Sequence, residues 1–211
     1  MRRSALLLPI LVVALLVLAA FAKDFAMPRL VPAATMAFHD SHGNEKVTFG
    51  ADAYDTPEKA ALFRQKMLEH NILPVRVVFT NDGDQPIVLN HVSFQLVTRD
   101  RAKATPYNLN DLWRAFSSVR PPNSRTIDQL PIPLPGRNKA HGGVSQRDRD
   151  ELGQAIFAAR GVEPHGSQQG FLFFDSGDLD NAAQGARLYA TGVADAHGHE
   201  LMYFEVPLDG K

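Results

Sequence analysis

The alternation of apolar and polar residues is the strongest pattern in the sequence. Along residues 72–97 the apolar residues lie first at odd and then at even positions, as in Val75, Val77, Ile87 and Leu89 followed by Val92, Phe94 and Leu96. Side chains of a strand alternate between its two faces, so this change of parity requires a bulge, a kink or a bend. We therefore predict two strands joined by a tight turn at residues 81–86, with a bend at Asn90-His91 where the second strand crosses between sheets.

Other segments show equally clear periodicities. Alternating or wholly apolar runs predict further strands at residues 46–54, 170–175, 185–192 and 200–208. Helical spacing of apolar residues predicts helices at residues 55–71, 108–116 and 145–160. The first of these helices has a strong start signal. Asp55 is the predicted N-cap, Pro57 needs no N–H partner in the first turn, and Glu58 completes a capping box.

These elements predict a mainly β protein, namely an immunoglobulin-like β-sandwich with two or three short helical insertions and a proline-rich loop. Strictly repeated β-α units, which build doubly wound sheets, are missing. The loop is the proline- and glycine-rich stretch 119–144, in which five prolines fall within fifteen positions. Proline neither donates to a sheet nor fits inside a helix, so we predict an extended insertion there. We expect one domain over residues 45–208, preceded by an N-terminal extension at 23–44.

The first 22 residues have the pattern of an export signal. Arg2 and Arg3 precede seventeen largely apolar residues that end in the small-x-small sequence Ala20-Phe21-Ala22. We predict a Sec signal peptide that is cleaved after Ala22, and hence a periplasmic or secreted protein. The alternative is an uncleaved membrane anchor, although a run of this length lies at the lower limit for crossing a bilayer.

Composition narrows the classes of function. Without Arg2 and Arg3 the 22 basic residues fall to 20 against 23 acidic ones, a net charge of about −3. Such a chain has no general attraction to nucleic acid or anionic lipid. It has no cysteine, and therefore neither disulfides nor a cysteine nucleophile. Gly-x-Ser-x-Gly elbows and glycine-rich phosphate loops are missing as well. We predict no catalytic residues, no cofactor and no enzymatic activity.

Three stretches carry a resemblance to a known group of proteins: LPVRVVFTNDGDQPIVL, VEPHGSQQGFLFFD and GARLYATGVADAHGHELMYFEVPL. They resemble small secreted bacterial proteins of uncharacterised function that carry an immunoglobulin-like domain. In this group Pro-Gly-Ser/Thr commonly precedes the apolar strand, whereas here His165-Gly166-Ser167 stands in its place. The resemblance covers roughly residues 45–100 and 160–208. It implies an extracytoplasmic interaction or accessory module, and it transfers a fold rather than an active site.

Two histidine pairs are the sharpest candidates for chemistry. His39 and His42 lie three residues apart, and His197 and His199 flank a glycine. Imidazole suits zinc or copper, so a periplasmic metal-binding protein is the alternative function. Both pairs lie in turn-like sequence, where histidine is an ordinary surface residue.

Two further clusters receive structural interpretations. The aspartates of 82–84 and 175–180 are interpreted as turn formers rather than calcium ligands, because their spacing is incomplete for a calcium loop. Trp113 with Phe116 and Arg114 could form a sugar- or peptide-binding platform, but we favour a short helix that buries the two rings.

The leading hypothesis is an exported, non-enzymatic binding or accessory module that acts through protein–protein contacts in the cell envelope. The expected partner is an envelope or secreted protein, and no nucleic acid is expected to bind. Contact with the membrane is expected only if the signal segment stays uncleaved. The expected mode of contact is strand addition at an open sheet edge, or contact through the insertion at 119–144.

Overall fold

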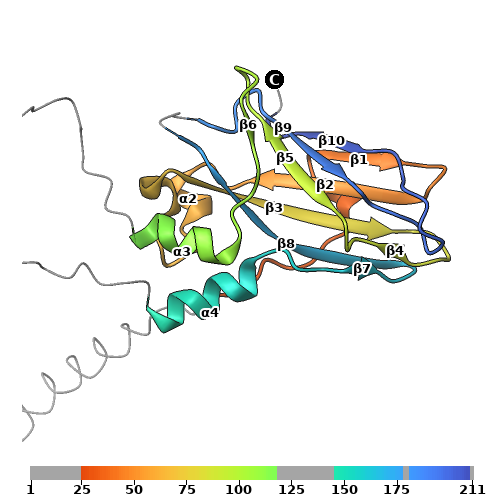
Figure 1. Ribbon diagram of the computed structural model, residues 1–211, viewed down its shortest axis with the longest axis horizontal. Helices are drawn as coiled ribbons and strands as arrows, with labels where there is room; N and C mark the ends of the chain where they lie inside the picture. The colour runs from red at the N-terminus through yellow and green to blue at the C-terminus, as the bar shows by residue number, and fades with distance from the viewer. Residues whose placement is uncertain (1–24, 118–144, 178–180, 210–211) are drawn as a thin grey trace, which may run out of the picture.

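The computed structural model describes residues 25–117, 145–177 and 181–209. Within these residues the chain is mainly β, with ten strands in antiparallel sheets and three short α-helices (Figure 1). The predicted signal segment at 1–22 and the predicted insertion at 119–144 lie outside the described residues. None of the helices within the described part is long and apolar enough to cross a membrane.

The first sheet has four antiparallel strands in the order β1 (His39–His42), β2 (Val47–Ala53), β3 (Ile72–Asn81) and β8 (Gly166–Asp175). Strand β3 is buried at every position. A strand of this kind is covered on both faces, so its apolar residues do not alternate strictly. Its buried polar residues Arg76, Thr80 and Asn81 form hydrogen bonds. The predicted strand at 46–54 is confirmed as β2, and the one at 170–175 is the second half of β8.

The second sheet has the order β10 (Phe204–Pro207), β9 (Arg187–Thr191), β5 (Ser93–Val97) and β6 (Lys103–Ala104). Its inner residues share one apolar cluster with those of the first sheet, so the two sheets pack face to face. Ring contacts cross between them: Phe49 and Phe79 of the first sheet meet Phe94 and Phe204 of the second, with centroids 6.0–6.3 Å apart. A short pair of strands, β4 (Ile87–Val88) and β7 (Gly161–Val162), lies beside them.

One lateral edge of this two-sheet arrangement is closed by β1 and β10. The His42 ring stacks on Phe204 with centroids 4.0 Å apart. The Glu205 N–H donates to Asp40 Oδ2 at 3.0 Å. Strand β1 falls within the predicted N-terminal extension at 23–44, which therefore contributes an edge strand.

The outer face of the first sheet is covered by further elements. A second apolar cluster joins Phe171 and Phe173 of β8 to helices α3 (Leu109–Ser117), α4 (Gln146–Ala155) and η3 (Met67–His70). The N-terminal segment, with η2 (Ala33–Thr35), also lies on this sheet. Its Arg29 carbonyl accepts a hydrogen bond from Arg76 at 2.7 Å, and the Ala33 N–H donates to Thr80 Oγ1 at 2.8 Å.

The predicted bend at Asn90-His91 is confirmed. Residues 89–92 form a turn in which the Val92 N–H donates to the Leu89 carbonyl at 3.1 Å, and they separate β4 from β5, which lie in different sheets. Gly192 lies against this bend, because a Cβ on it would be 2.3 Å from the His91 carbonyl oxygen. The bend thus depends on a close backbone approach that only glycine allows.

The predicted hairpin is wrong. Strand β3 pairs with β2 on one side and β8 on the other, so neither of its edges is left for β4. The turn residues still act as predicted: Asn81 Oδ1 accepts from the Gly83 N–H at 3.0 Å, and Asn81 Nδ2 donates to the Gln85 carbonyl at 2.8 Å. The turn therefore sends the chain toward the other sheet instead of back along β3.

The predicted helix at 55–71 is also wrong in its length and its N-cap. Helix α2 spans Pro57–Ala60 and its N-cap is Thr56 rather than Asp55. In a continuous helix the Arg64 N–H would bond to the Ala60 carbonyl. Here it donates to Glu151 Oε1 at 2.8 Å. A contact 87 residues away in sequence thus replaces the helical hydrogen bond. The helix predicted at 108–116 is confirmed as α3. The one predicted at 145–160 is confirmed in part as α4, which ends at Ala155, because Ile156 is extended and bridges to Phe171 of β8.

Candidate binding surfaces

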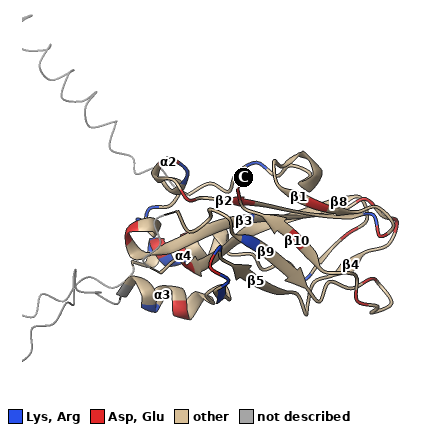
Figure 2. Ribbon diagram, turned by 90° about the horizontal axis from the view of Figure 1, so that it is seen from above, with Lys and Arg blue, Asp and Glu red and all other residues tan. Residues whose placement is uncertain are grey.

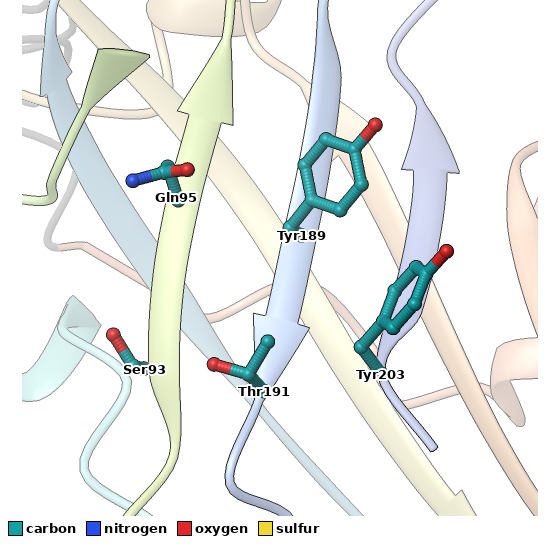
Figure 3. A pocket seen from close by; sticks show the side chains of 5 residues that line it. All are labelled: Ser93, Gln95, Tyr189, Thr191 and Tyr203. Atoms are coloured by element: carbon teal, nitrogen blue, oxygen red, sulfur yellow. The ribbon is translucent and has the colours of Figure 1, made fainter.

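The outer face of the second sheet carries a shallow hollow of about 310 Å³. Side chains alternate between the two faces of a strand. Phe94 and Leu188 point into the core, so the residues next to them in sequence lie on the outer face. Those outward residues, together with one from the segment before β10, line the hollow: Ser93, Gln95, Tyr189, Thr191 and Tyr203 (Figure 3). We call this set the tyrosine face.

The two tyrosine rings stand next to each other, with centroids 6.1 Å apart and planes tilted by 42°. Tyr203 is 48% exposed and its neighbour Met202 is 65% exposed. Burial raises the pKa of the Tyr189 phenol, and the carboxylate of Glu205 across the strand pair raises it further. Tyr189 therefore stays protonated and able to donate a hydrogen bond across the physiological range.

The chemistry of the tyrosine face suits binding. Its rings offer apolar area, and its hydroxyl and amide groups offer both donors and acceptors. Ser93 and Thr191 have no histidine or carboxylate among the lining residues to activate them. The nearby charges are paired, since Arg187 forms an ion pair with Glu205. Charges of both signs are interspersed over the described ribbon (Figure 2).

A second hollow of about 400 Å³ lies at the lateral edge opposite β1 and β10. Its walls come from β5, from residues 106–108 and from residues 156–160, with Leu172 of β8 also lining it. Apolar side chains such as Val92 and Phe94 line part of it, whereas Asn90, Asn108 and Arg160 supply polar groups. We call this hollow the edge hollow.

The structure places the first histidine pair on β1. His39 Nδ1 lies 2.9 Å from the Met36 carbonyl oxygen. His42 lies between two carboxylates, with Nδ1 2.8 Å from Glu45 Oε2 and Nε2 3.5 Å from Asp40 Oδ2. Since its ring also stacks on Phe204, His42 has a structural role in closing the sheet edge.

The second histidine pair lies in the exposed turn between β9 and β10. The His197 and His199 rings are 6.2 Å apart, and His199 Nδ1 is 3.0 Å from Asp195 Oδ2. In the described part of the chain, no three His, Asp or Glu residues are grouped in a way that could hold a metal ion. The metal-binding alternative stays a prediction, to which the geometry adds no support.

Trp113 and Asp175, which the sequence offered as further candidates, have structural roles. Trp113 of α3 is partly buried against the second apolar cluster, and the Arg149 guanidinium of α4 lies 5.2 Å from its ring. The Asp175 side chain accepts from the Gly177 N–H at 2.8 Å, as a turn former does. Residues 178–180 of the same acidic stretch lie outside the described part.

Helix α4 carries two carboxylates, Asp148 and Glu151, whose burial the sequence did not indicate. Glu151 is only 4% exposed, and its Oε2 has no hydrogen-bond partner among the described residues. Burial raises the pKa of Glu151. Burial also acts to raise the pKa of Asp148, but hydrogen bonds from Ser145 and Gln65 and the charge of Arg64 outweigh it, so this pKa lies below its ordinary value. The dipole of α4 would lower the pKa of both carboxyl groups near its N-terminus, so it does not account for two opposite shifts.

Sequence reasoning also missed the tyrosine face. The alternation in 185–192 and 200–208 carried a signal, since Tyr189 and Tyr203 both fall in segments predicted as strands. The alternation did not show whether the odd-numbered or the even-numbered residues face the core. That is decided by the pairing of β9 with β5 and β10, which puts Leu188 and Ala190 inside.

No protein-family model matches the chain, and no curated protein matches it either. Among solved structures, a crystal structure of a conserved hypothetical protein from Bacillus anthracis is similar at 12% sequence identity. That match covers 84% of this chain and 89% of the other, with a TM-score of 0.30. A likeness this weak carries no argument about fold or function.

Proposed function

We propose that this protein is an exported, non-enzymatic binding module that acts through protein–protein contacts in the cell envelope. The observation that carries the proposal is the tyrosine face: two neighbouring tyrosines, an exposed methionine and hydroxyl and amide groups on a sheet face that no described element covers. Tyrosine and methionine are enriched at protein interfaces. Tyrosine also buries a large area there at low cost in conformational entropy. Export rests on the N-terminal sequence alone.

The fold we propose for the module is an immunoglobulin-like sandwich. In the first sheet β2, β3 and β8 are neighbours, and in the second the order is β10-β9-β5-β6. These orders correspond to strands A-B-E and G-F-C-C′ of immunoglobulin domains. With that assignment β1 is an added edge strand, and α3 and α4 lie in the connection between C′ and E.

The proposal is tested by site-specific photo-crosslinking in intact cells. A photoreactive phenylalanine analogue at Tyr203 or Met202 is expected to crosslink one partner protein. The matched control is the same analogue at Leu30, which is 43% exposed but lies away from the tyrosine face. Crosslinks of equal yield at all three positions, or none at Tyr203 and Met202, would reject the tyrosine face as the contact surface.

A further inference from the structure

Strand β5 is paired along only part of its outer edge. Strand β9 pairs with all of β5, from Ser93 to Val97, whereas β6 pairs only with Leu96 and Val97. Among the described strands, none pairs with Ser93 to Gln95 on the β6 side. The second sheet is therefore open at this point.

The direction of the free backbone groups follows from the ladder. The Thr98 N–H donates to the Ala102 carbonyl at 2.9 Å, so even-numbered residues direct their backbone groups toward the β6 side. Residues of an antiparallel strand alternate in this respect, and Phe94 therefore directs its N–H and C=O to the open side. The residue that would continue β6 opposite Phe94 is Pro106, which has no N–H to donate.

The chain after Pro106 turns away from β5 toward the other sheet. The Tyr107 N–H donates to the Phe173 carbonyl of β8 at 2.7 Å. On the other side, the Leu89 N–H donates to the Arg160 carbonyl at 2.8 Å. The edge hollow lies between residues 106–108 and residues 156–160, directly beside the open part of β5.

Charge adds a further constraint on what could occupy the site. Arg160 lines the edge hollow and its side chain is exposed. Within the described residues, no carboxylate forms an ion pair with it. A partner that places an acidic group there gains a charge-assisted hydrogen bond.

We propose that an extended peptide segment of a partner protein adds to β5 beside Phe94, places an apolar side chain in the edge hollow and an acidic side chain next to Arg160. Main-chain hydrogen bonds to Phe94 supply affinity, and the hollow and Arg160 supply selectivity. The inference rests on the proposed binding function, but it uses the backbone edge of β5 and the edge hollow, which adjoin the tyrosine face at Ser93 and Gln95. It assigns the partner's contacting segment to one class, an extended strand with an apolar and an acidic residue.

The test begins with a phage-displayed library of random linear peptides, selected against the purified chain without its first 22 residues. Selected peptides are synthesised with single N-methyl groups at successive backbone positions. An added strand directs every second N–H to β5, so methylation at alternate positions is expected to weaken binding about tenfold, with little effect at the positions between. Binding is also expected to slow hydrogen exchange at the Phe94 amide.

Matched variants complete the test. Arg160→Glu is expected to weaken peptide binding about tenfold, whereas Arg147→Glu, the same charge change at an exposed position of α4, leaves it unchanged. Tyr203→Ala is expected to leave peptide binding unchanged as well. Three results would overturn the inference: no selected peptide protects the Phe94 amide, N-methylation acts without alternation, or the two arginine variants behave alike. Any of them would leave the crosslinking result at Tyr203 standing, so the two proposals fail separately.

Discussion

The two sheets differ most in what lies on their outer faces. The outer face of the first sheet is covered by α3, α4, η3 and the N-terminal segment, and its Phe171 and Phe173 are fully buried. The outer face of the second sheet carries Tyr189, Tyr203 and short polar side chains instead. One sheet therefore uses both faces for stability, and the other has a face left for contact. Substitutions in the two places are expected to separate stability from binding.

The largest expected effect is on the covered face. Phe173→Ala removes a fully buried ring that meets Phe63 edge-on at 5.6 Å. We expect a loss of about 3–5 kcal/mol in the free energy of unfolding, measured by urea denaturation. Tyr203→Ala on the exposed face is expected to change it by no more than about 0.5 kcal/mol. Similar losses for the two variants would contradict the contrast between the faces.

A smaller loss is expected at Gly170, where the segment after α4 lies against β8. A Cβ on Gly170 would lie 2.4 Å from Phe157 Cα, beside the Phe157 N–H bond to the Phe171 carbonyl. Gly170→Ala is expected to lower the free energy of unfolding by about 1–3 kcal/mol. The control is Gly153→Ala in α4, where the added Cβ meets nothing within 4 Å. It should raise stability by about 0.5–1 kcal/mol. If Gly170→Ala is neutral, the segment at 156–157 is not held against β8.

The carboxylates of α4 give a pH-dependent test of how this helix is held on the first sheet. The pKa of Glu151 is raised above its ordinary 4.5, so the folded state holds the proton more tightly than the unfolded state. The stability of the protein relative to Glu151→Gln should therefore fall as pH rises above about 4.5.

The contribution of Asp148 to stability has the opposite pH dependence. Its pKa lies below the ordinary 3.8, so its contribution is present above that pH and is lost as pH falls through the lower folded value. Stability relative to Asp148→Asn should fall on acidification. Urea denaturation across the acid range measures both slopes. Equal signs for the two variants would mean that Glu151 is not buried as described.

The smallest effect is expected from metal. Because no suitable group of ligands occurs within the described residues, zinc or copper should leave the melting temperature unchanged. A rise in melting temperature that is lost in a variant with His39 and His42, or His197 and His199, replaced by Ala would revive the metal-binding alternative.

Local patterns were enough to predict most strands and the bend at Asn90-His91, because apolar parity is a property of neighbouring residues. Two predictions failed where a distant partner decides the outcome. Helix α2 ends at Ala60: the Leu62 and Phe63 N–H groups donate to carbonyls three residues back, and Glu151 takes the Arg64 N–H. The hairpin after β3 does not form because β8 occupies that edge.

The tyrosine face could be predicted only in part, for a related reason. Sequence alternation shows that Tyr189 shares a parity with Arg187 and Thr191, but strand pairing decides that this parity faces outward. The edge hollow had no sequence signal, since it arises from the different directions taken by residues 106–108 and 156–160.

The central claim is that the exposed face of the second sheet is the contact surface. Its most direct test is the affinity of the crosslinked partner, once purified, for the protein and for two variants. Tyr203→Ala is expected to weaken binding by at least about thirtyfold, as removal of a central aromatic contact does, whereas Leu30→Ala leaves it unchanged. Equal affinities for the protein and Tyr203→Ala would contradict the account.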